Sequence, residues 1–320
     1  MLVTGASGFV GRAIIRHLVG RGDDVTVAVR DRRRLMDLAD FEGATVLEND
    51  LLDVRRLADD LRDVDAVAHA AGRYRVGISR ADRGAMWDAN IGTTTRVLDA
   101  AEAAGVQRIV YLSTVGVFGN TRGRVVEEGY RRDLRDGFLS WYDETKYGAH
   151  EVAQQRAASG APVVIVLPSQ VYGPGDHSAL GDQIRQANAG RLRALALDDV
   201  GLGFVHVDDL AAGIIAALDR GVAGQSYVLS GPRARLYEVL EIAARLGGRS
   251  LPGLRVPGAL MRALVPLGGV IGQPGFAEIV ASGDGVTYWA SSAKAESELG
   301  FVARSIEEGL RDLFGVAELP

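Results

Sequence analysis

The sequence predicts an α/β protein in which a doubly wound parallel sheet is followed by a smaller, mostly helical C-terminal region. Through the first half, short β-branched runs alternate with helical patterns; the runs lie at 1–4, 24–29, 44–48, 65–70, 108–113 and 162–167. Longer helical stretches cover about 82–104 and 142–158. Strands that alternate with helices are typical of βαβ units, which build parallel sheets covered by helices on both faces.

Two domains that interleave along the chain are expected. The chain has 320 residues, more than one hydrophobic core usually serves. After residue 168 the pattern becomes loop-rich, strand-like runs return at 204–207 and 226–231, and short helices dominate from 235 onward. We therefore expect a large domain over 1–168 plus about 203–230, and a smaller substrate-binding domain over about 169–202 plus 231–320.

Composition and charge exclude several classes of function. The formal net charge of -5 and the pI of about 5.6 disfavour a nucleic-acid partner. The absence of cysteine rules out disulfides, thiolate catalysis and cysteine-ligated zinc. The chain opens on a folded pattern instead of a signal peptide, and its apolar runs are too short to cross a bilayer. We therefore expect a cytoplasmic protein without a membrane partner.

Several polar residues are interpreted as structural. His69, His150, His177 and His206 are scattered without ligand spacing, and carboxylates do not cluster around them, so no metal site is expected. The run 131–136, in which arginines and aspartates alternate, is typical of an exposed loop.

A glycine-rich turn directly follows the first strand. Gly5, Gly8 and Gly11 have the spacing GxxGxxG and stand at the start of a helix. Glycine permits a tight turn and the close approach of the backbone to a pyrophosphate, and the helix N-terminus supplies free N–H groups. A glycine triplet alone is weak evidence, but here a strand precedes it, a helix follows it and βαβ units continue. The sequence therefore predicts a Rossmann-type domain that binds a nicotinamide dinucleotide.

The end of the second strand favours NADP over NAD. An acidic residue at this point would bind the adenosine ribose of NAD, whereas this chain continues from Val29 into Arg30-Asp31-Arg32-Arg33-Arg34. The planar donors of arginine match phosphate oxygens, so Arg30 and Arg33 suit the 2′-phosphate of NADP. Asp31 lies beyond the strand end and keeps NAD open as the alternative.

A tyrosine and a lysine are candidates for proton transfer. Tyr142 and Lys146 stand four residues apart in a helical stretch and therefore share one helix face. A buried ammonium near the phenol would lower the pKa of the tyrosine and suit it to exchange a proton with a carbonyl or alcohol oxygen. A strand that ends in Ser113-Thr114 supplies a hydroxyl that could bond the same oxygen.

The order and spacing of these motifs resemble the extended short-chain dehydrogenases/reductases, the NAD-dependent epimerase/dehydratase superfamily, nearly from end to end. The chain looks most like dihydroflavonol-reductase-like, 3β-hydroxysteroid-dehydrogenase-like and hopanoid-associated sugar epimerase-like members. The resemblance implies cofactor contacts from the phosphate loop, an adenine-contacting pair, the stretch after the fourth strand, a helix asparagine and the loop beside the nicotinamide. In this sequence the corresponding residues are Gly5, Ser7, Gly8, Phe9, Val10, Asp50, Leu51, Ala70, Ala71, Gly72, Asn90, Pro168 and Val171.

The resemblance also implies catalytic roles and an assembly. Tyr142 would exchange the proton, Lys146 would hold the nicotinamide ribose, and Thr114, not Ser113, would bond the reacting oxygen. Related proteins often dimerise through the two helices that correspond to 82–104 and 142–158, so a homodimer is expected. Small and apolar residues that could support such packing, although ordinary core packing needs the same residues, are Leu98, Ala101, Ala149 and Ala153.

Two departures from the family pattern bear on the substrate. Family dehydratases follow the catalytic threonine with Asp-Glu, where this chain has Val115-Gly116. Sugar-nucleotide enzymes often carry an arginine where this chain has Leu202, although Arg255 or Arg262 could substitute. Segment 251–283 has few charges and many apolar residues, and residues 73–75 either line the pocket or form a solvated loop.

These features lead to three hypotheses about function. The first is an NADP(H)-dependent oxidoreductase that interconverts a ketone or aldehyde and its alcohol on a small or medium apolar substrate. The second is an epimerase that oxidises and re-reduces one carbon. The third is a non-catalytic dinucleotide sensor, which the presence of Thr114, Tyr142 and Lys146 disfavours.

Overall fold

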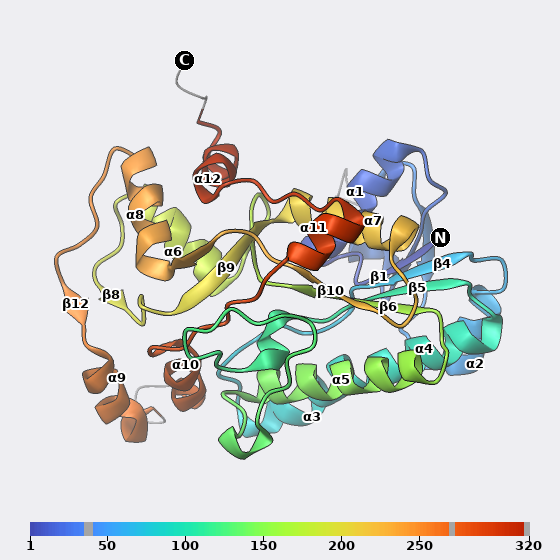
Figure 1. Ribbon diagram of the computed structural model, residues 1–320, viewed down its shortest axis with the longest axis horizontal. Coiled ribbons are helices and arrows are strands. Elements are labelled where there is room, and N and C mark those ends of the chain that lie inside the picture. The colour runs from blue at the N-terminus through green and yellow to red at the C-terminus, as the bar shows by residue number, and fades with distance from the viewer. Residues whose placement is uncertain (35–40, 269–272, 317–320) are drawn as a thin grey trace.

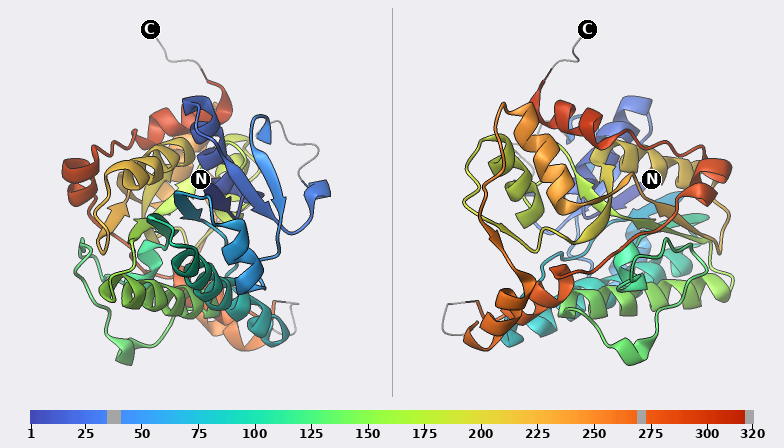
Figure 2. Two further views of the ribbon diagram at one scale, coloured as in Figure 1. Left: turned by 90° about the vertical axis from the view of Figure 1, so that its right-hand side faces the viewer. Right: turned by 60° about the vertical axis from the view of Figure 1, so that its left-hand side comes forward.

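The computed structural model describes residues 1–34, 41–268 and 273–316. A parallel sheet lies between two layers of helices, and a smaller lobe that carries α6, α8, β8, β12 and α9 extends from one end (Figure 1). Figure 2 shows the same arrangement from two further directions.

The central sheet has seven strands, and all of its pairings are parallel. Their order is β10-β6-β5-β4-β1-β2-β3, so the chain moves outward from β1 in one direction and then crosses to β4 on its other side. This order confirms the doubly wound fold, in which ligands bind at the crossover point. The strands are β1 (Leu2–Thr4), β2 (Thr26–Val29), β3 (Thr45–Glu48), β4 (Ala66–His69), β5 (Arg108–Leu112), β6 (Val163–Pro168) and β10 (Ser226–Leu229).

Helices cover both faces of this sheet, because its strands are apolar on both sides. One layer holds α1 (Phe9–Arg21), α7 (Val207–Arg220) and α11 (Ala293–Leu299), and the other holds α2 (Val54–Asp60), α4 (Thr93–Ala104) and α5 (Trp141–Ala158). The predicted helix over 82–104 is divided into α3 (Arg83–Trp87), a π-helical turn (Asp88–Gly92) and α4. Such π turns are frequent at functional sites.

The smaller lobe is built around a three-stranded sheet, β11-β9-β7. Its strands are β7 (Gln170–Tyr172), β9 (Gly201–His206) and β11 (Arg233–Arg235), and a parallel pair joins β8 (Leu195–Ala196) to β12 (Arg255–Val256). Its helices are α6 (Ala179–Asn188), α8 (Leu236–Leu246), α9 (Gly258–Leu264), α10 (Phe276–Gly283) and α12 (Ile306–Phe314). A separate core cluster, which includes Phe204, Leu240 and Leu310, holds α6, α8 and α12 together.

The fold bears on two expectations, that no segment crosses a membrane and that four small residues support a dimer interface. No helix in the described ranges is long and apolar enough to cross a membrane. Leu98, Ala101, Ala149 and Ala153 are fully buried within the single chain, so these four residues serve its own core and leave no surface for a partner.

Candidate functional site

The turn after β1 leaves no room for a side chain. Gly5 has φ of 73°, and a Cβ there would lie 2.6 Å from the backbone of Ala70 and Ala71 at the end of β4. A Cβ on Gly11 would lie 2.2 Å from the Gly5 carbonyl oxygen. The glycines therefore allow the first turn of α1 to pack directly against the crossover point between β1 and β4.

The N-terminus of α1 is open for a phosphate. Gly8 is its N-cap, no side chain caps the first turn, and the first turn contains no acidic residue. Ser7 and Gly8 are exposed. Free N–H groups and the positive end of the helix dipole thus meet at one accessible point, which fits the pyrophosphate of a dinucleotide.

The arginine run at the end of β2 is divided by its contacts. Arg33 pairs with Asp31 at 3.0 Å, and Arg32 donates to the carbonyl of Val46 at 2.8 Å. Arg30 is exposed, and no other described residue bonds its guanidinium. Of the two arginines expected to bind the 2′-phosphate, Arg30 is the one whose donors are available.

Asp50-Leu51, the pair expected to contact the adenine, lies in a constrained turn after β3. Leu51 has φ of 62°, an uncommon conformation for a branched residue. Asn49 accepts from the Leu51 amide at 2.7 Å, and Arg96 donates to the Leu51 carbonyl at 2.9 Å. Asp50 is exposed. Non-glycine residues held at positive φ concentrate at ligand sites because the surrounding structure must stabilise them.

Thr114, Tyr142 and Lys146 meet where β5 ends and α5 begins. Ser140 caps α5 by accepting from the Asp143 amide, which fixes the start of the helix just before Tyr142. Lys146 lies one turn further along, buried, and its Nζ donates to the Leu112 carbonyl at 2.9 Å. The two predicted hydroxyls differ: the Ser113 Oγ lies 2.9 Å from the buried His150 Nδ1, whereas Thr114 is half-buried beside Tyr142.

Burial has the largest effect on the pKa values of Tyr142 and Lys146. It raises the pKa of Tyr142, with a smaller upward effect from Tyr74 and a partial offset by the Thr114 hydroxyl. Burial also lowers the pKa of Lys146 to about 8. The expectation was that Lys146 lowers the pKa of the tyrosine; in this structure the pKa of Tyr142 is instead raised, and Lys146 is not among the groups that shift it. Burial of the phenolate therefore favours the protonated phenol.

Tyr74, from the segment 73–75, lies beside Tyr142. Its ring packs edge-on against the ring of Tyr142, and its side chain is exposed. Asn90, on the π-helical turn, accepts from the Arg73 amide at 2.7 Å and donates to the Arg73 carbonyl at 3.2 Å and to Thr145 at 2.9 Å. Asn90 thus fixes the start of the segment that carries Tyr74.

The expectation of an exposed loop at 131–136 is wrong for Arg132. Its guanidinium pairs with Asp143 at 2.7 Å, and both side chains are less than a tenth exposed. It also lies over the rings of Phe138 and Tyr147. Asp143 directly follows Tyr142, so this buried pair anchors the loop to the first turn of α5.

Carboxylates do gather around one histidine, contrary to expectation. His206 Nε2 lies 3.2 Å from Asp312 and its Nδ1 lies 3.8 Å from Asp208. However, Nδ1 accepts a hydrogen bond from the Asp208 amide, so a neutral His206 carries its proton on Nε2. Arg16 and Arg304 pair with the same two carboxylates. With Nε2 protonated and each carboxylate paired with an arginine, we interpret this cluster as an ion-pair network.

The remaining substrate-side candidates are arranged as follows. Arg255 pairs with Asp198 at 2.6 Å and Arg262 pairs with Asp284, so both guanidiniums are already neutralised. Within segment 251–283, α10 packs against Gly77, next to the Tyr74 segment; residues 269–272 lie outside the described ranges.

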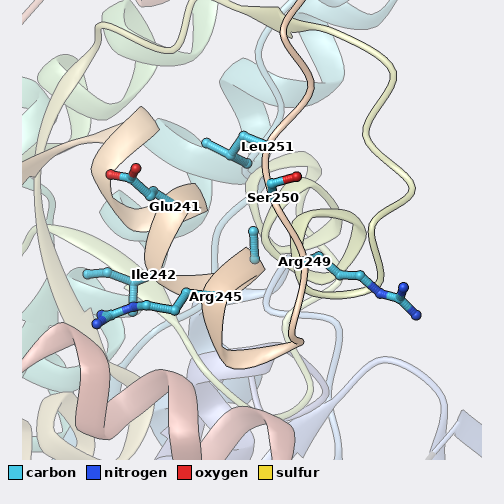
Figure 3. A pocket seen from close by; sticks show the side chains of 7 residues that line it. Glu241, Ile242, Arg245, Arg249, Ser250 and Leu251 are labelled. Carbon is cyan, nitrogen blue, oxygen red and sulfur yellow. The ribbon is translucent and has the colours of Figure 1, made fainter.

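A surface hollow of about 440 Å³ on α8, lined in part by Glu241 and Arg245, contains none of the predicted site residues (Figure 3).

The fold and this site define a dinucleotide-binding α/β protein, and comparisons with known proteins specify its family. The model of the NAD dependent epimerase/dehydratase family matches residues 1–230. The chain belongs to this family.

Individual relatives have several activities. Sterol demethylase protein B of Methylococcus capsulatus is 31% identical over 83% of this chain and 80% of its own, and a putative dihydroflavonol 4-reductase of Synechocystis sp. is 30% identical over 97% and 92%. A UDP-glucose 4-epimerase of Streptomyces lividans is 27% identical over 80% of this chain and 83% of its own. The solved structure of gox2253 has a TM-score of 0.82 and 29% identity, covering 98% and 96% of the two chains.

One signal for the site was present in the sequence but was missed. Lysine occurs only at 146 and 294, and the other 34 of the 36 basic residues are arginine. In a chain that uses arginine almost everywhere, each lysine is a candidate for a place that needs a compact ammonium, and one of the two, Lys146, lies in the site.

Proposed function

We propose that the chain is an NADP(H)-dependent oxidoreductase that interconverts a ketone or aldehyde and the corresponding alcohol. The observation that carries this proposal is the grouping of the Tyr142 phenol, the Thr114 hydroxyl and the Lys146 ammonium at the end of β5, on the same edge of the parallel sheet as the open N-terminus of α1. When bound, the nicotinamide supplies or accepts the hydride.

In this proposal each side chain has one task. Tyr142 gives its proton to the carbonyl oxygen in reduction, and its raised pKa keeps that proton in place until the oxygen becomes basic. Thr114 donates a hydrogen bond to the same oxygen. Lys146 directs an N–H group toward the nicotinamide ribose. Arg30 binds the 2′-phosphate, which favours NADP, and NAD stays the alternative.

The proposed substrate is small or medium in size and largely apolar. Leu202 packs against the apolar core of the smaller lobe, where sugar-nucleotide enzymes of the family often have arginine. Arg255 and Arg262 are already paired with carboxylates. The exposed ring of Tyr74 beside Tyr142 offers an apolar surface for the substrate. These three features supply apolar contact and no cationic group for a diphosphate.

A panel of ketones and aldehydes, followed by the loss of NADPH absorbance, tests the proposal directly. We expect turnover with an apolar carbonyl compound and a preference for NADPH over NADH. The epimerase alternative, favoured by the relative that acts on UDP-glucose, predicts conversion of a sugar without net consumption of cofactor. Best binding by UDP- or GDP-sugars in a thermal-shift screen would reject the apolar substrate, and NADP binding without any turnover would favour the sensor.

We also infer a homodimer, as the resemblance implies. Since the four small residues named for its interface are buried within the chain, the contact must use other side chains of these helices, such as the half-exposed Trp87 on α3. Light scattering at micromolar concentration is the test, and a monomer there would refute the dimer.

A further inference from the structure

The ammonium of Lys146 is held from behind by two neutral oxygens. Its Nζ donates to the Leu112 carbonyl at 2.9 Å and to the Tyr111 hydroxyl at 3.4 Å. Tyr111 is 1% exposed and lies on β5, directly beneath the site. No carboxylate forms an ion pair with Lys146 anywhere in the described part of the chain. Position and charge of this side chain therefore depend on these two acceptors.

A buried chain of hydrogen bonds whose protons can be assigned lies beside Tyr111. Thr94 donates to the Asn90 carbonyl at 2.7 Å, so its oxygen can only accept from His69 Nε2, at 3.1 Å. His69 Nδ1 then accepts from Thr4 at 2.7 Å. The assignment agrees with burial, which lowers the pKa of His69 to about 3 and keeps its ring neutral.

The Tyr111 oxygen accepts from Lys146, because an ammonium can only donate. The hydrogen bonds of His69 to Thr4 and Thr94 hold its ring, which stacks on the Tyr111 ring at a centroid distance of 5.6 Å and so restrains the phenol. An ammonium has three N–H donors. Leu112 and Tyr111 take two of them, and the third is left for a ligand hydroxyl.

We propose that Tyr111 is a positioning residue that sets the location of the Lys146 ammonium and aims its remaining N–H at the ribose of the bound dinucleotide. The part of this proposal that concerns the ribose rests on the proposed function; the Tyr111–Lys146 contact does not. The titratable groups around the ammonium are Tyr111 on β5, His69 on β4, and Tyr142 and His150 on α5.

The chain contains its own matched control. Its second lysine, Lys294, also lies over the ring of a buried tyrosine, with Nζ 4.6 Å from the Tyr227 centroid. The Tyr227 hydroxyl bonds Glu298 and the Val222 amide, outside the candidate site. Tyr227→Phe thus removes a phenol oxygen from a tyrosine beside a lysine, as Tyr111→Phe does, but it leaves the candidate site unchanged.

The experiment is an NMR titration of the two lysines in protein labelled at lysine Cε, with Lys146→Arg to assign the signals. In Tyr111→Phe we expect the midpoint of Lys146 to fall by about one pH unit, because the charged form loses an acceptor, while the Lys294 signal is unchanged. In Tyr227→Phe the Lys146 midpoint should stay at its wild-type value. Calorimetry should show NADP binding weakened about tenfold by Tyr111→Phe and unaffected by Tyr227→Phe.

An unmoved Lys146 midpoint in folded Tyr111→Phe would overturn the proposal, and so would an equal shift in Tyr227→Phe. If Tyr111→Phe does not fold, Tyr111→Leu, which also removes the phenol oxygen, decides by the same titration. A wild-type chain that binds no NADP(H) would reject the proposed function, and the lysine titration would still decide the role of Tyr111.

Discussion

The ring of Tyr74 meets the ring of Tyr142 edge to face, with centroids 4.9 Å apart and planes at 89°. The segment that carries Tyr74 is fixed at both ends: Asn90 bonds the Arg73 backbone, and Gly77 packs against Gly275 so closely that a Cβ on Gly275 would lie 2.0 Å from the Gly77 carbonyl carbon. An exposed aromatic ring held this firmly beside a proton donor is suited to contact an apolar substrate.

Replacement of this ring should change substrate selection. Tyr74→Ala is expected to raise the KM for bulky or cyclic ketones roughly tenfold, the scale of a lost aromatic contact, and to change that for short aliphatic ketones little. Tyr74→Phe should resemble the wild type, because it keeps the ring. Steady-state kinetics on both substrate sets is the measurement, and equal losses on both would show that Tyr74 does not select between them.

The proposed role of Tyr142 as proton donor is tested by removal of its phenol oxygen. Tyr142→Phe leaves the ring packing nearly unchanged, so fold and NADP affinity should survive. Turnover should fall at least about 10²-fold because the proton donor is lost. Tyr147→Phe is the matched control: its ring faces Arg132 and Phe138, and its loss of a hydroxyl should be nearly silent. Near-normal turnover in Tyr142→Phe, with an inactive Tyr147→Phe, would reverse the assignment.

Cofactor preference is tested at Arg30. Arg30→Ala should weaken NADP binding about 10- to 100-fold, the scale of a lost charge-assisted hydrogen bond, and change NAD binding little. Arg32→Ala serves as the control, because that guanidinium donates to the Val46 carbonyl. Calorimetric titration with both dinucleotides gives the answer, and an equal loss for NAD and NADP would mean that Arg30 does not contact the 2′-phosphate.

The phosphate loop should not tolerate a methyl group at Gly5. Gly5→Ala places Cβ against the backbone of Ala70 and Ala71 and forces alanine into positive φ, so the loop must move. We expect loss of NADP binding and of thermal stability. Gly20→Ala, on the same helix with nothing within 4 Å, is the control and should leave both unchanged. Calorimetry combined with thermal unfolding would contradict this if Gly5→Ala bound NADP normally.

Two buried histidines should make the fold sensitive to acid. Burial lowers the pKa of His69 to about 3 and that of His150 to about 4, from an ordinary 6.5. The unfolded chain therefore binds more protons, and stability that is complete above pH 6.5 is lost as the pH falls toward 4. Between pH 7 and pH 5 we expect each histidine to cost about 2 kcal/mol in the free energy of unfolding.

Urea denaturation at the two pH values measures this loss. His150→Gln should shrink the difference between pH 7 and pH 5 by about 2 kcal/mol. His177 is exposed, so His177→Gln controls for the removal of an imidazole and should leave the difference unchanged. A His150→Gln protein with the full acid sensitivity of the wild type would exclude His150 as a source.

The fold followed from the sequence because its signals are local. Runs of β-branched residues alternate with helical periodicity, and parallel β1, β4, β5 and β6 appear within a residue or two of the predicted ranges. The glycine spacing after β1 predicted an open turn, since a side chain on Gly8 or Gly11 would meet the Gly5 carbonyl oxygen in the turn itself; only the fold shows that Gly5 also faces Ala70 and Ala71. The spacing of Tyr142 and Lys146 likewise placed both on one turn of α5.

Only the tertiary structure decided which charges are buried and which side chains meet across the fold. Arg132 looked like a loop residue until packing enclosed it with Asp143, and His206 gained its two carboxylates from α7 and α12, the second more than a hundred residues away in sequence. The pKa of Tyr142 rises although Lys146 is one turn away, because desolvation depends on every atom packed around the phenol. Sequence spacing determines which groups share an element; the packing of distant elements determines their solvation and their partners.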